Sequence, residues 1–484
     1  MPYHYGLKLR LPIQTIGGES SVYAAGKEVQ IHLKKTMLYS PYRVMHGEYA
    51  GTGLPNTDDV SSEPLRIQSP YNAAYVGSLA SLVLSESDCQ HFPRVYGVFS
   101  GIAERHVLDI SDDYEDLCDR PWFSQNIGHF FDLRLRKPEM PAIELAETAE
   151  SIDLGAVDIE PLALPTPPIP PTTAGYDGDT EETPEEMGES DSCSTDYIFG
   201  VRSASSDDSS DEEDDDEDTG DGFSEDEHDE AFAHAVFKDA PIQVTVMEKC
   251  SGTLYTLFKE NQEIEKRCAW LSQVIFGLAY AQRTFGFVHN DLHVMNVMYV
   301  PTASEHFYYI VGGRSYRVPT YGKLIKIIDF DRASFSVKVP KLKDAKFFMS
   351  DQFHQDEEAG GQYNIDPFYN PKYPEIKLNP SFDLVRLATS MFWDCFPRGP
   401  DESYFHNPLY KMFMSWLTLP DGKSILFRNP AEGDFSERYR GFHLYKAIAR
   451  YCRDTAVPRK QIEKFGSVYS IDKVPRGEAC LVIE

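Results

Sequence analysis

The most informative part of the chain is a short segment in which polar side chains are spaced among apolar ones: Val288-His289-Asn290-Asp291-Leu292-His293-Val294-Met295-Asn296-Val297-Met298. A second segment further along ends an apolar run with a carboxylate: Ile327-Ile328-Asp329-Phe330. We expect residues 289–296 to form a loop that leads into a strand at 297–300, next to a second strand at 324–328. Asn296 and Asp329 would then lie at the same end of one hairpin.

Three side chains of these segments are of the types that phosphoryl transfer requires. Such a reaction depends on a group that orients the attacking hydroxyl and on oxygen ligands that hold Mg²⁺ against the nucleotide phosphates. We therefore predict Asp291, Asn296 and Asp329 as catalytic residues, with Asn296 and Asp329 as metal ligands. An Asp taken alone is more often a solvated loop or helix-capping residue. The prediction rests on the order of all three between apolar strands.

The formal charge of −31 is concentrated in one part of the chain. Residues 144–230 hold 31 Asp and Glu side chains and one basic side chain, Arg202, so the remainder is almost neutral. Such a charged segment with few aromatic residues cannot bury enough apolar surface to offset the entropy of ordering, and we expect it to be disordered. The simplest interpretation is a solvated insertion. The alternatives are that it binds basic proteins or competes for basic substrates.

Other features of the composition exclude several classes of protein. The eight cysteines lie far apart and form no CxxC pair, so neither a zinc site nor a disulfide framework is expected. The N-terminus lacks the charged and then apolar layout of a signal peptide, and no apolar run reaches membrane-spanning length. We expect a soluble intracellular protein that contacts neither a membrane nor nucleic acid directly.

Periodicity predicts a strand-rich part followed by a helix-rich part, and hence an α+β fold. In the first part we expect strands at 21–35 and 242–247, a helix at 70–84, and a loop that enters a strand at 91–99. In the second part we expect a helix at 261–285 that ends before Gly286, and a hairpin at 307–318. Ser381 is expected to cap a helix that runs to Phe392, with Asp383 in its first turn.

This order of elements resembles the protein kinase fold, with a β-rich lobe and a mainly helical lobe. The chain is more closely similar to the serine/threonine protein kinases predicted for large nucleocytoplasmic DNA viruses, which carry a comparable HNDLHxxNxM loop. The likeness covers residues 240–465 well and residues 60–100 more loosely. It implies a first lobe at 1–102, an insertion at 103–235, a last strand and hinge at 236–252, and a helical lobe with the catalytic loop at 253–484. Further segments that carry the likeness are Ile327-Ile328-Asp329-Phe330-Asp331-Arg332-Ala333, Asn379-Pro380-Ser381-Phe382-Asp383 and Phe442-His443-Leu444-Tyr445.

The resemblance implies an ATP- and Mg²⁺-dependent phosphotransferase, located in the host cytoplasm or the virion. It would transfer the γ-phosphate to a Ser or Thr hydroxyl of a protein substrate. Asp383 would brace the catalytic loop through the loop backbone. Lys34 would contact the phosphates, glycines near residue 17 would cradle them, and the hinge would receive adenine. The cofactor-binding residues implied in this way are Lys34, Gly17, Gly18, Met247, Glu248 and Cys250.

Several positions depart from the kinase pattern. Asp331 stands where a Gly is usual, and His293 stands where protein kinases have a Lys, as in some small-molecule kinases of the same fold. The helix at 70–84 offers no Glu to pair with Lys34, and the glycine loop is poor. Two alternatives therefore stay open: a pseudokinase that serves as a binding module, and a small-molecule kinase. Because Asn290 replaces the usual loop Arg, we expect no activation by phosphorylation of the segment after Asp329.

Overall fold

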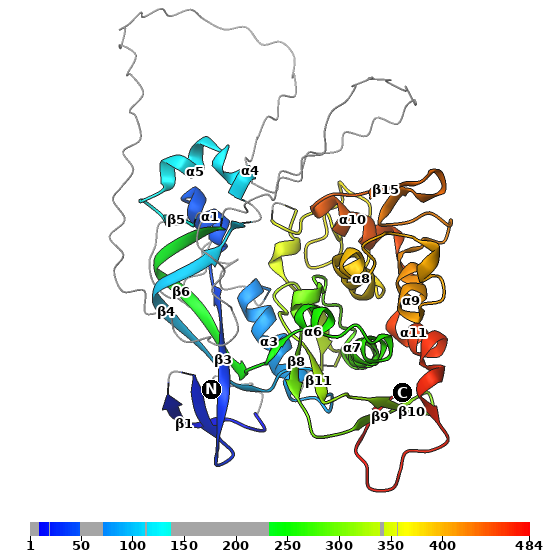
Figure 1. The fold of residues 1–484 in the computed structure, drawn as a ribbon. Helices are drawn as coiled ribbons and strands as arrows, with labels where there is room; N and C mark the ends of the chain where they lie inside the picture. Colours follow the sequence, from blue (N-terminus) through cyan, green and yellow to red (C-terminus); the bar gives the residue numbers. More distant parts are fainter. Residues whose placement is uncertain are drawn as a thin grey trace, which may run out of the picture.

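The computed structural model describes residues 9–18, 20–48, 71–111, 114–136, 232–338, 343–355 and 357–484. The protein is a mixed α+β structure, as the sequence predicts. A twisted antiparallel sheet lies beside a larger part that holds most of the helices (Figure 1). The acidic segment at 144–230, which the sequence predicts to be disordered, lies outside the described residues. Within the described ranges, no helix combines the length and the apolar character needed to cross a bilayer.

Six strands form the large sheet, in the order β1-β2-β3-β6-β4, with β5 also paired to β6. All of these pairs are antiparallel. β3 pairs with β6 as far as Met37 and Ile242, and β5 takes up the same edge of β6 further on. The strands are β1 (Ile13–Gly18), β2 (Ser21–Ala24), β3 (Lys27–Met37), β4 (Val95–Asp109), β5 (Asp132–Arg136) and β6 (Phe232–Glu248).

The sheet extends further than the sequence indicated. The expected boundary at residue 102 falls inside β4, and β6 begins before the expected start at 236. β4 and β6 stay paired from Val95 and Met247 to Asp109 and His234, so their backbones form one long ribbon. Residues assigned to the insertion therefore continue the sheet, because each strand satisfies the hydrogen bonds of the other along this whole length.

A small cap of helices covers the far end of this ribbon (Figure 1). It consists of α1 (Pro41–His46), α4 (Tyr114–Cys118) and α5 (Pro121–Asn126). The cap has its own apolar core, in which Met45, Leu117 and Phe123 pack with Phe131 and Phe237. The sequence did not predict this core, because its members come from two segments on either side of a long insertion.

Helix α3 (Ala73–Ser85) connects the sheet with the helical part, at the place where the sequence predicts a helix at 70–84. The Asn72 side chain caps it by accepting a hydrogen bond from the Ala74 N–H at 3.0 Å. Ser78 and Thr245 of β6 form a buried hydroxyl pair at 2.9 Å. Toward the helical part, Tyr71, just before α3, packs edge-to-face against Phe368, with ring centroids 5.9 Å apart.

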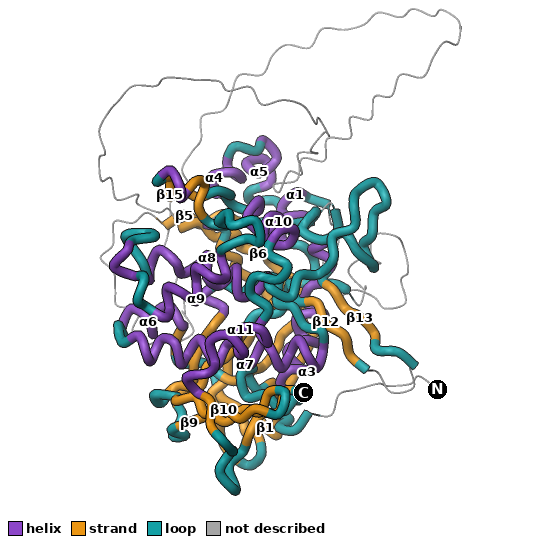
Figure 2. Tube along the Cα trace, turned by 90° about the vertical axis from the view of Figure 1, so that its right-hand side faces the viewer, coloured by secondary structure: helices purple, strands orange, loops and turns teal. Residues whose placement is uncertain are grey.

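Helix α7 forms the centre of the helical part. It ends at Gly286 as predicted, with a φ of +58° at that residue, but it begins at Ile264 and not at the predicted Asn261, which follows the end of α6. Residues on most of its faces are buried, including Leu271, Val274 and Phe276, because other helices and strands surround it (Figure 2). The helices of this part are α6 (Leu254–Glu260), α7 (Ile264–Phe285), α8 (Phe382–Cys395), α9 (Pro408–Leu417), α10 (Phe442–Tyr451) and α11 (Pro458–Phe465).

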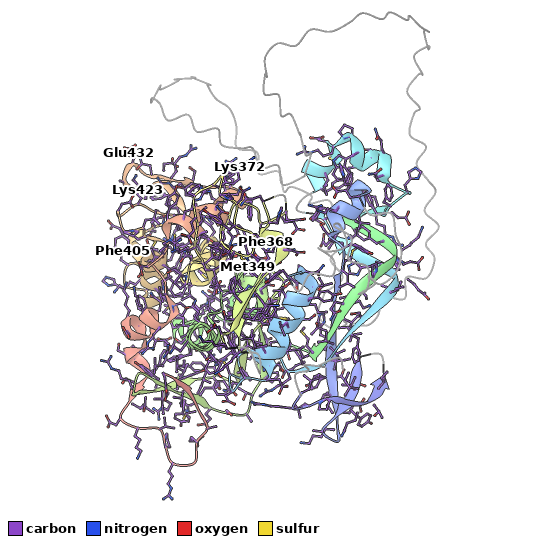
Figure 3. All side chains as sticks on the ribbon, turned by 180° about the vertical axis from the view of Figure 1, so that it is seen from behind. Met349, Phe368, Lys372, Phe405, Lys423 and Glu432 are labelled. Carbon is purple, nitrogen blue, oxygen red and sulfur yellow. The ribbon has the colours of Figure 1, made fainter. Side chains whose placement is uncertain are left out.

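Short strands complete the helical part. Strands β8 and β11 pair as antiparallel neighbours, as predicted for the two site strands, although β9 and β10 lie between them in the chain. β9 and β10 turn at Gly312 and Gly313, where both φ angles are positive. The strands are β7 (Gly252–Thr253), β8 (Val297–Pro301), β9 (His306–Val311), β10 (Arg314–Pro319), β11 (Lys323–Ile327), β12 (Ser334–Val337), β13 (Lys346–Met349), β14 (Phe427–Asn429), β15 (Asp434–Glu437), β16 (Ser470–Ile471) and β17 (Cys480–Ile483). Met349 and Phe368 lie toward α3, whereas Phe405 and Glu432 lie on the opposite side (Figure 3).

The prediction that the Ser381 side chain caps α8 is wrong. Ser381 precedes the helix, but its backbone is already helical, with φ −88° and ψ −11°, so its hydroxyl makes no capping bond to the first turn. The hydroxyl instead donates to the Arg453 carbonyl at 2.9 Å and accepts from the Ala456 N–H at 3.2 Å. Ser381 therefore ties the start of α8 to the segment between α10 and α11.

Candidate functional site

The loop after α7 is held by a buried carboxylate. The N–H groups of His289 and Asn290 donate to the two oxygens of Asp383, each at 3.0 Å. Asp383 has no solvent exposure and lies in the first turn of α8. Burial raises the pKa of Asp383 to about 7, against the lowering effect of the two N–H donors. The bracing contact implied by the kinase resemblance is therefore present in the geometry.

Asn290 joins the loop to the segment after Asp329. Its backbone has a φ of +66°, a conformation that Asn tolerates better than most residues. Its Nδ2 donates to the Arg332 carbonyl at 2.9 Å and to the Ser334 hydroxyl at 3.0 Å. Its Oδ1 accepts from the Tyr363 hydroxyl at 2.9 Å. The sequence identified Asn290 only as a replacement for Arg and did not predict these bonds.

The hairpin of β8 and β11 brings Asn296 and Asp329 to one end, as predicted. Val297 pairs with Ile327, and the Ile328 N–H donates to the Asn296 carbonyl at 3.0 Å. The Nδ2 group of Asn296 lies 3.0 Å from both the Asp291 carbonyl and His293 Nε2. Because both of its hydrogens are used in this way, Oδ1 is the atom of Asn296 that remains to bind a cation.

The Asp291 carboxylate is held from two sides. Its Oδ1 accepts from the Tyr445 hydroxyl of α10 at 2.7 Å, and its Oδ2 lies 3.7 Å from Arg332 Nη1. Burial acts to raise the pKa of Asp291, but Arg332 and Tyr445 outweigh it and hold this pKa below its ordinary value. Asp291 is therefore ionised at neutral pH. The sequence analysis assigned no role to Tyr445 or Arg332. Both lie in segments that carry the kinase resemblance, and this was the available signal for them.

Lys34 reaches this site from the sheet. Its Nζ lies 2.6 Å from Asp329 Oδ1 and 2.8 Å from Asp331 Oδ1. Burial acts to lower the pKa of Lys34, and the two carboxylates reverse this and raise it. Burial likewise acts to raise the pKa of Asp329, but Lys34 lowers it to about 2. Burial raises the pKa of Asp331; Lys34 opposes this rise, and the charge of Asp329 adds to it. The structure thus unites Lys34 with the predicted metal ligand.

The glycines of the predicted phosphate loop lie apart from these contacts. Gly17 and Gly18 end β1, at the tip of the hairpin with β2. A Cβ at position 17 would lie 2.8 Å from the Ser21 hydroxyl and 3.4 Å from the Ser21 carbonyl oxygen, so a larger residue would require the Ser21 side chain to move. Ser21 in turn donates to Glu28 at 2.7 Å.

The predicted hinge lies where β6 leaves the sheet. Met247 is buried, and Glu248 forms an ion pair with Lys326 at 2.9 Å. The Glu248 carboxylate also accepts from the Arg94 N–H at 3.2 Å. The side chain of Glu248 therefore fixes the hinge to the helical part and is not left for a ligand. The backbone N–H of Glu248 donates to the Arg94 carbonyl. Within the part of the chain that the structure describes, the backbone N–H of Cys250 has no hydrogen-bond acceptor.

A cavity of about 380 Å³ adjoins Lys34 and the two carboxylates. Its other walls come from the end of β3 and the residues up to Tyr42, from β4, from the start of α3, and from Asp351, Gln352, Glu357 and Glu358. None of the three hinge residues lines it. Its lining includes Asp351, Glu357 and Glu358, of which Glu357 pairs with Arg43 at 2.7 Å and Glu358 with Arg332 at 3.3 Å.

The donor set fits a nucleotide-bound Mg²⁺ better than an independent metal ion. Over the ranges that the structure describes, no group of three or more His, Cys, Asp or Glu side chains is arranged to hold a metal. Asn296 and Asp329 supply one amide oxygen and one carboxylate. Mg²⁺ usually takes one or two carboxylates from a protein and completes its shell with phosphate oxygens and water. The two residues match that requirement.

Comparisons with known proteins add little to this geometry. No family model matches the chain. A stretch of 69 residues is 28% identical to the Uncharacterized protein ZK177.2 of Caenorhabditis elegans. The stretch makes up 14% of this chain and 23% of that protein, so the match spans less than a quarter of the relative's length.

Removal of the Asp383 carboxylate tests the bracing of the loop. Asp383→Ala leaves two buried N–H groups without an acceptor, and we expect a loss of about 2–4 kcal/mol in the free energy of unfolding, measured by urea denaturation. The matched control is Asp394→Ala, at the exposed end of the same helix, with an expected change within about 0.5 kcal/mol. Equal effects of the two substitutions would show that Asp383 does not hold the loop.

Proposed function

We propose that the chain is an ATP- and Mg²⁺-dependent phosphotransferase with a two-lobed protein kinase-like fold. The proposed acceptor is a Ser or Thr hydroxyl of a protein, as in the kinases of large DNA viruses that the sequence resembles. One observation carries the proposal. Lys34 and Asp329, which are 295 residues apart, meet at 2.6 Å beside the loop that holds Asp291 and Asn296. A cation and a carboxylate supplied by two parts of the fold are what a nucleotide phosphate and its metal need.

Each residue has a distinct role in this proposal. Asp291, ionised and oriented by Tyr445, accepts a hydrogen bond from the acceptor hydroxyl and later its proton. Asn296 and Asp329 would hold Mg²⁺, which neutralises charge on the phosphates when it is bound. Lys34 contacts the phosphates as a point charge. His293 fixes the amide of Asn296 at 3.0 Å, so its proposed role is to orient a ligand of the metal.

The adenine would lie against the hinge. The Cys250 N–H is the donor that remains there, because the Glu248 N–H and carboxylate are already bonded. Met247, buried at the end of β6, would supply an apolar contact. Gly17 and Gly18 would bring the backbone of the first hairpin close to the phosphates. Of these assignments, Lys34 has the strongest geometric support and the two glycines have the weakest.

A pseudokinase that acts as a binding module is the second candidate. The observation that favours it is that the oxygens of Asp291 already have partners, a hydrogen bond from Tyr445 and the nearby guanidinium of Arg332.

A third candidate, a small-molecule kinase, keeps the same site and changes the acceptor. It is favoured by Asp331 and His293, and an acceptor screen with peptides, histones and alcohols separates it from a protein kinase.

Substitution of Asp291 tests the proposed chemistry. Asp291→Asn keeps the shape of the side chain and removes its charge, and we expect phosphate transfer from radiolabelled ATP to fall by about 10²- to 10⁴-fold. The melting temperature should change little. Asp394→Asn, on the exposed surface, is the matched control and should retain full transfer. Unchanged transfer by the Asp291→Asn protein would reject the assignment.

Thermal unfolding tests nucleotide binding without reference to the acceptor. At about 100 times its dissociation constant, Mg²⁺-ATP should add about 2.7 kcal/mol to the stability of the protein. The increase should vanish in the Asp329→Ala protein and after chelation of Mg²⁺. The absence of any shift in the unsubstituted protein would favour the binding module over the enzyme.

The acidic segment at 144–230 is proposed to modulate the choice of protein substrate and not the chemistry. Its charge of −30 should attract basic partners, and salt should weaken this attraction. Deletion of residues 144–230 is expected to change activity on basic peptides and its salt dependence, and to leave activity on neutral peptides unaltered. Identical rates and salt dependence on both peptide classes would exclude such a role.

A further inference from the structure

Helix α3 contains a glycine at a position where a side chain would normally help the helix. Gly77 lies well inside α3, and glycine is the least favourable residue after proline in a helix interior. Its φ is not in the left-handed region, so the backbone does not require it. The reason lies across the interface. A Cβ at position 77 would lie 2.0 Å from Asp331 Oδ1 and 3.2 Å from Asp331 Cα.

Asp331 uses the space that Gly77 leaves. Its Oδ1 lies 2.8 Å from Lys34 Nζ, and its Oδ2 accepts from the Thr36 hydroxyl at 3.3 Å. Both partners belong to β3, whereas Gly77 belongs to α3. The Asp331 carboxylate therefore lies between the helix and the sheet and contacts both. Lys34 and Asp331 are mostly shielded from solvent, with side-chain exposures of 20% and 22%. In such surroundings an ammonium group needs a fixed counter-charge.

We infer that Asp331 is the positioning residue of Lys34, taking the place of a carboxylate on helix α3, and that Gly77 exists to admit it. The inference rests on the proposed function in one respect, namely that Lys34 is the phosphate-contacting lysine. It also assigns different roles to the two carboxylates. Asp329, whose Oδ1 also contacts Lys34, would release the lysine when it binds the metal, while Asp331 would retain it.

The absence of a Glu on α3, the Asp at position 331 and the Gly at position 77 are then one coordinated change. Each of the three features depends on the other two. A Glu on α3 facing Lys34 would compete with Asp331, and any side chain at 77 would displace it. A role of Asp331 as a metal ligand is less favoured, because its two oxygens are occupied by Lys34 and Thr36.

A double-mutant cycle tests the packing without any ligand. Gly77→Ala should lower the melting temperature of the full-length protein, because the methyl group collides with Asp331. In an Asp331→Gly background the same substitution should lower it much less, because the contact with the side chain is gone and only the 3.2 Å approach to the backbone of residue 331 opposes the gain in helix propensity. Gly101→Ala, at an open position of β4, is the control for an added methyl group and should behave alike in both backgrounds. Equal effects of Gly77→Ala in the two backgrounds would overturn the inference.

Amine labelling tests the link to Lys34. Labelling of Lys34 by an amine-reactive reagent, followed by mass spectrometry, reports whether its ammonium group still contacts a carboxylate, because an amine released from its partner is more accessible to the reagent. We expect faster labelling in Asp331→Gly, reversed when Gly77→Glu is added, since that Glu would start where the Asp331 oxygen now lies. Leu82→Glu in the same background keeps the charge but not its place, and should not reverse it. Labelling that is unchanged by Asp331→Gly would overturn the assignment.

The affinity for Mg²⁺-ATP provides a separate test. Asp331→Gly should weaken Mg²⁺-ATP binding, measured by calorimetry, about tenfold or more, and Gly77→Glu should restore part of the affinity, whereas the Mg²⁺ concentration at half-saturation should stay the same. A large change in the Mg²⁺ requirement alone would make Asp331 a metal ligand and overturn the inference. If the unsubstituted protein binds no Mg²⁺-ATP, the proposed function fails, while the labelling and melting results still decide the placement of Lys34.

Discussion

The rest of the site depends on one partly buried ion cluster, in which Lys34 lies between Asp329 and Asp331. The lysine belongs to the sheet and the carboxylates follow the hairpin of the helical part, so this cluster is where two regions of the fold meet. Separating these charges without a replacement partner is costly in partly buried surroundings. The cluster therefore sets how β3 lies against the segment after β11. Glu248 and Lys326 make a second ion pair across the same boundary.

A second set of buried polar groups fixes the loop itself. Asp383 accepts from two successive N–H groups of the loop, and Asn290 bonds to Arg332, Ser334 and Tyr363. These bonds leave little freedom to the backbone on either side of Asp291. Because the groups are satisfied by partners distant in the chain, they specify one arrangement of the loop and would be unfavourable in any other. The loop around Asp291 is thus held by residues distant in the chain and not by local sequence.

Several features of the site and fold could be predicted because their physical cause is local. The apolar spacing of α7 and the glycine at its end define that helix, and the two apolar runs around Asn296 and Asp329 define β8 and β11. Antiparallel pairing of these strands places the two polar residues at one end. The cap of α1, α4 and α5 could not be predicted, because its core unites residues on both sides of a long insertion.

By itself, the sequence determined an α+β chain, the helix and hairpin that frame the loop, and the polar residues that converge there, since periodicity and residue order act over short distances. Only the tertiary structure decided the partners. Lys34 has no carboxylate on α3, and no pattern along the chain indicates that Asp331 takes this place or that Gly77 makes room for it. The physical reason is that charge pairing and steric fit depend on distances in space: Lys34 and Asp329 are 295 residues apart in the chain, and no sequence pattern indicates their 2.6 Å contact.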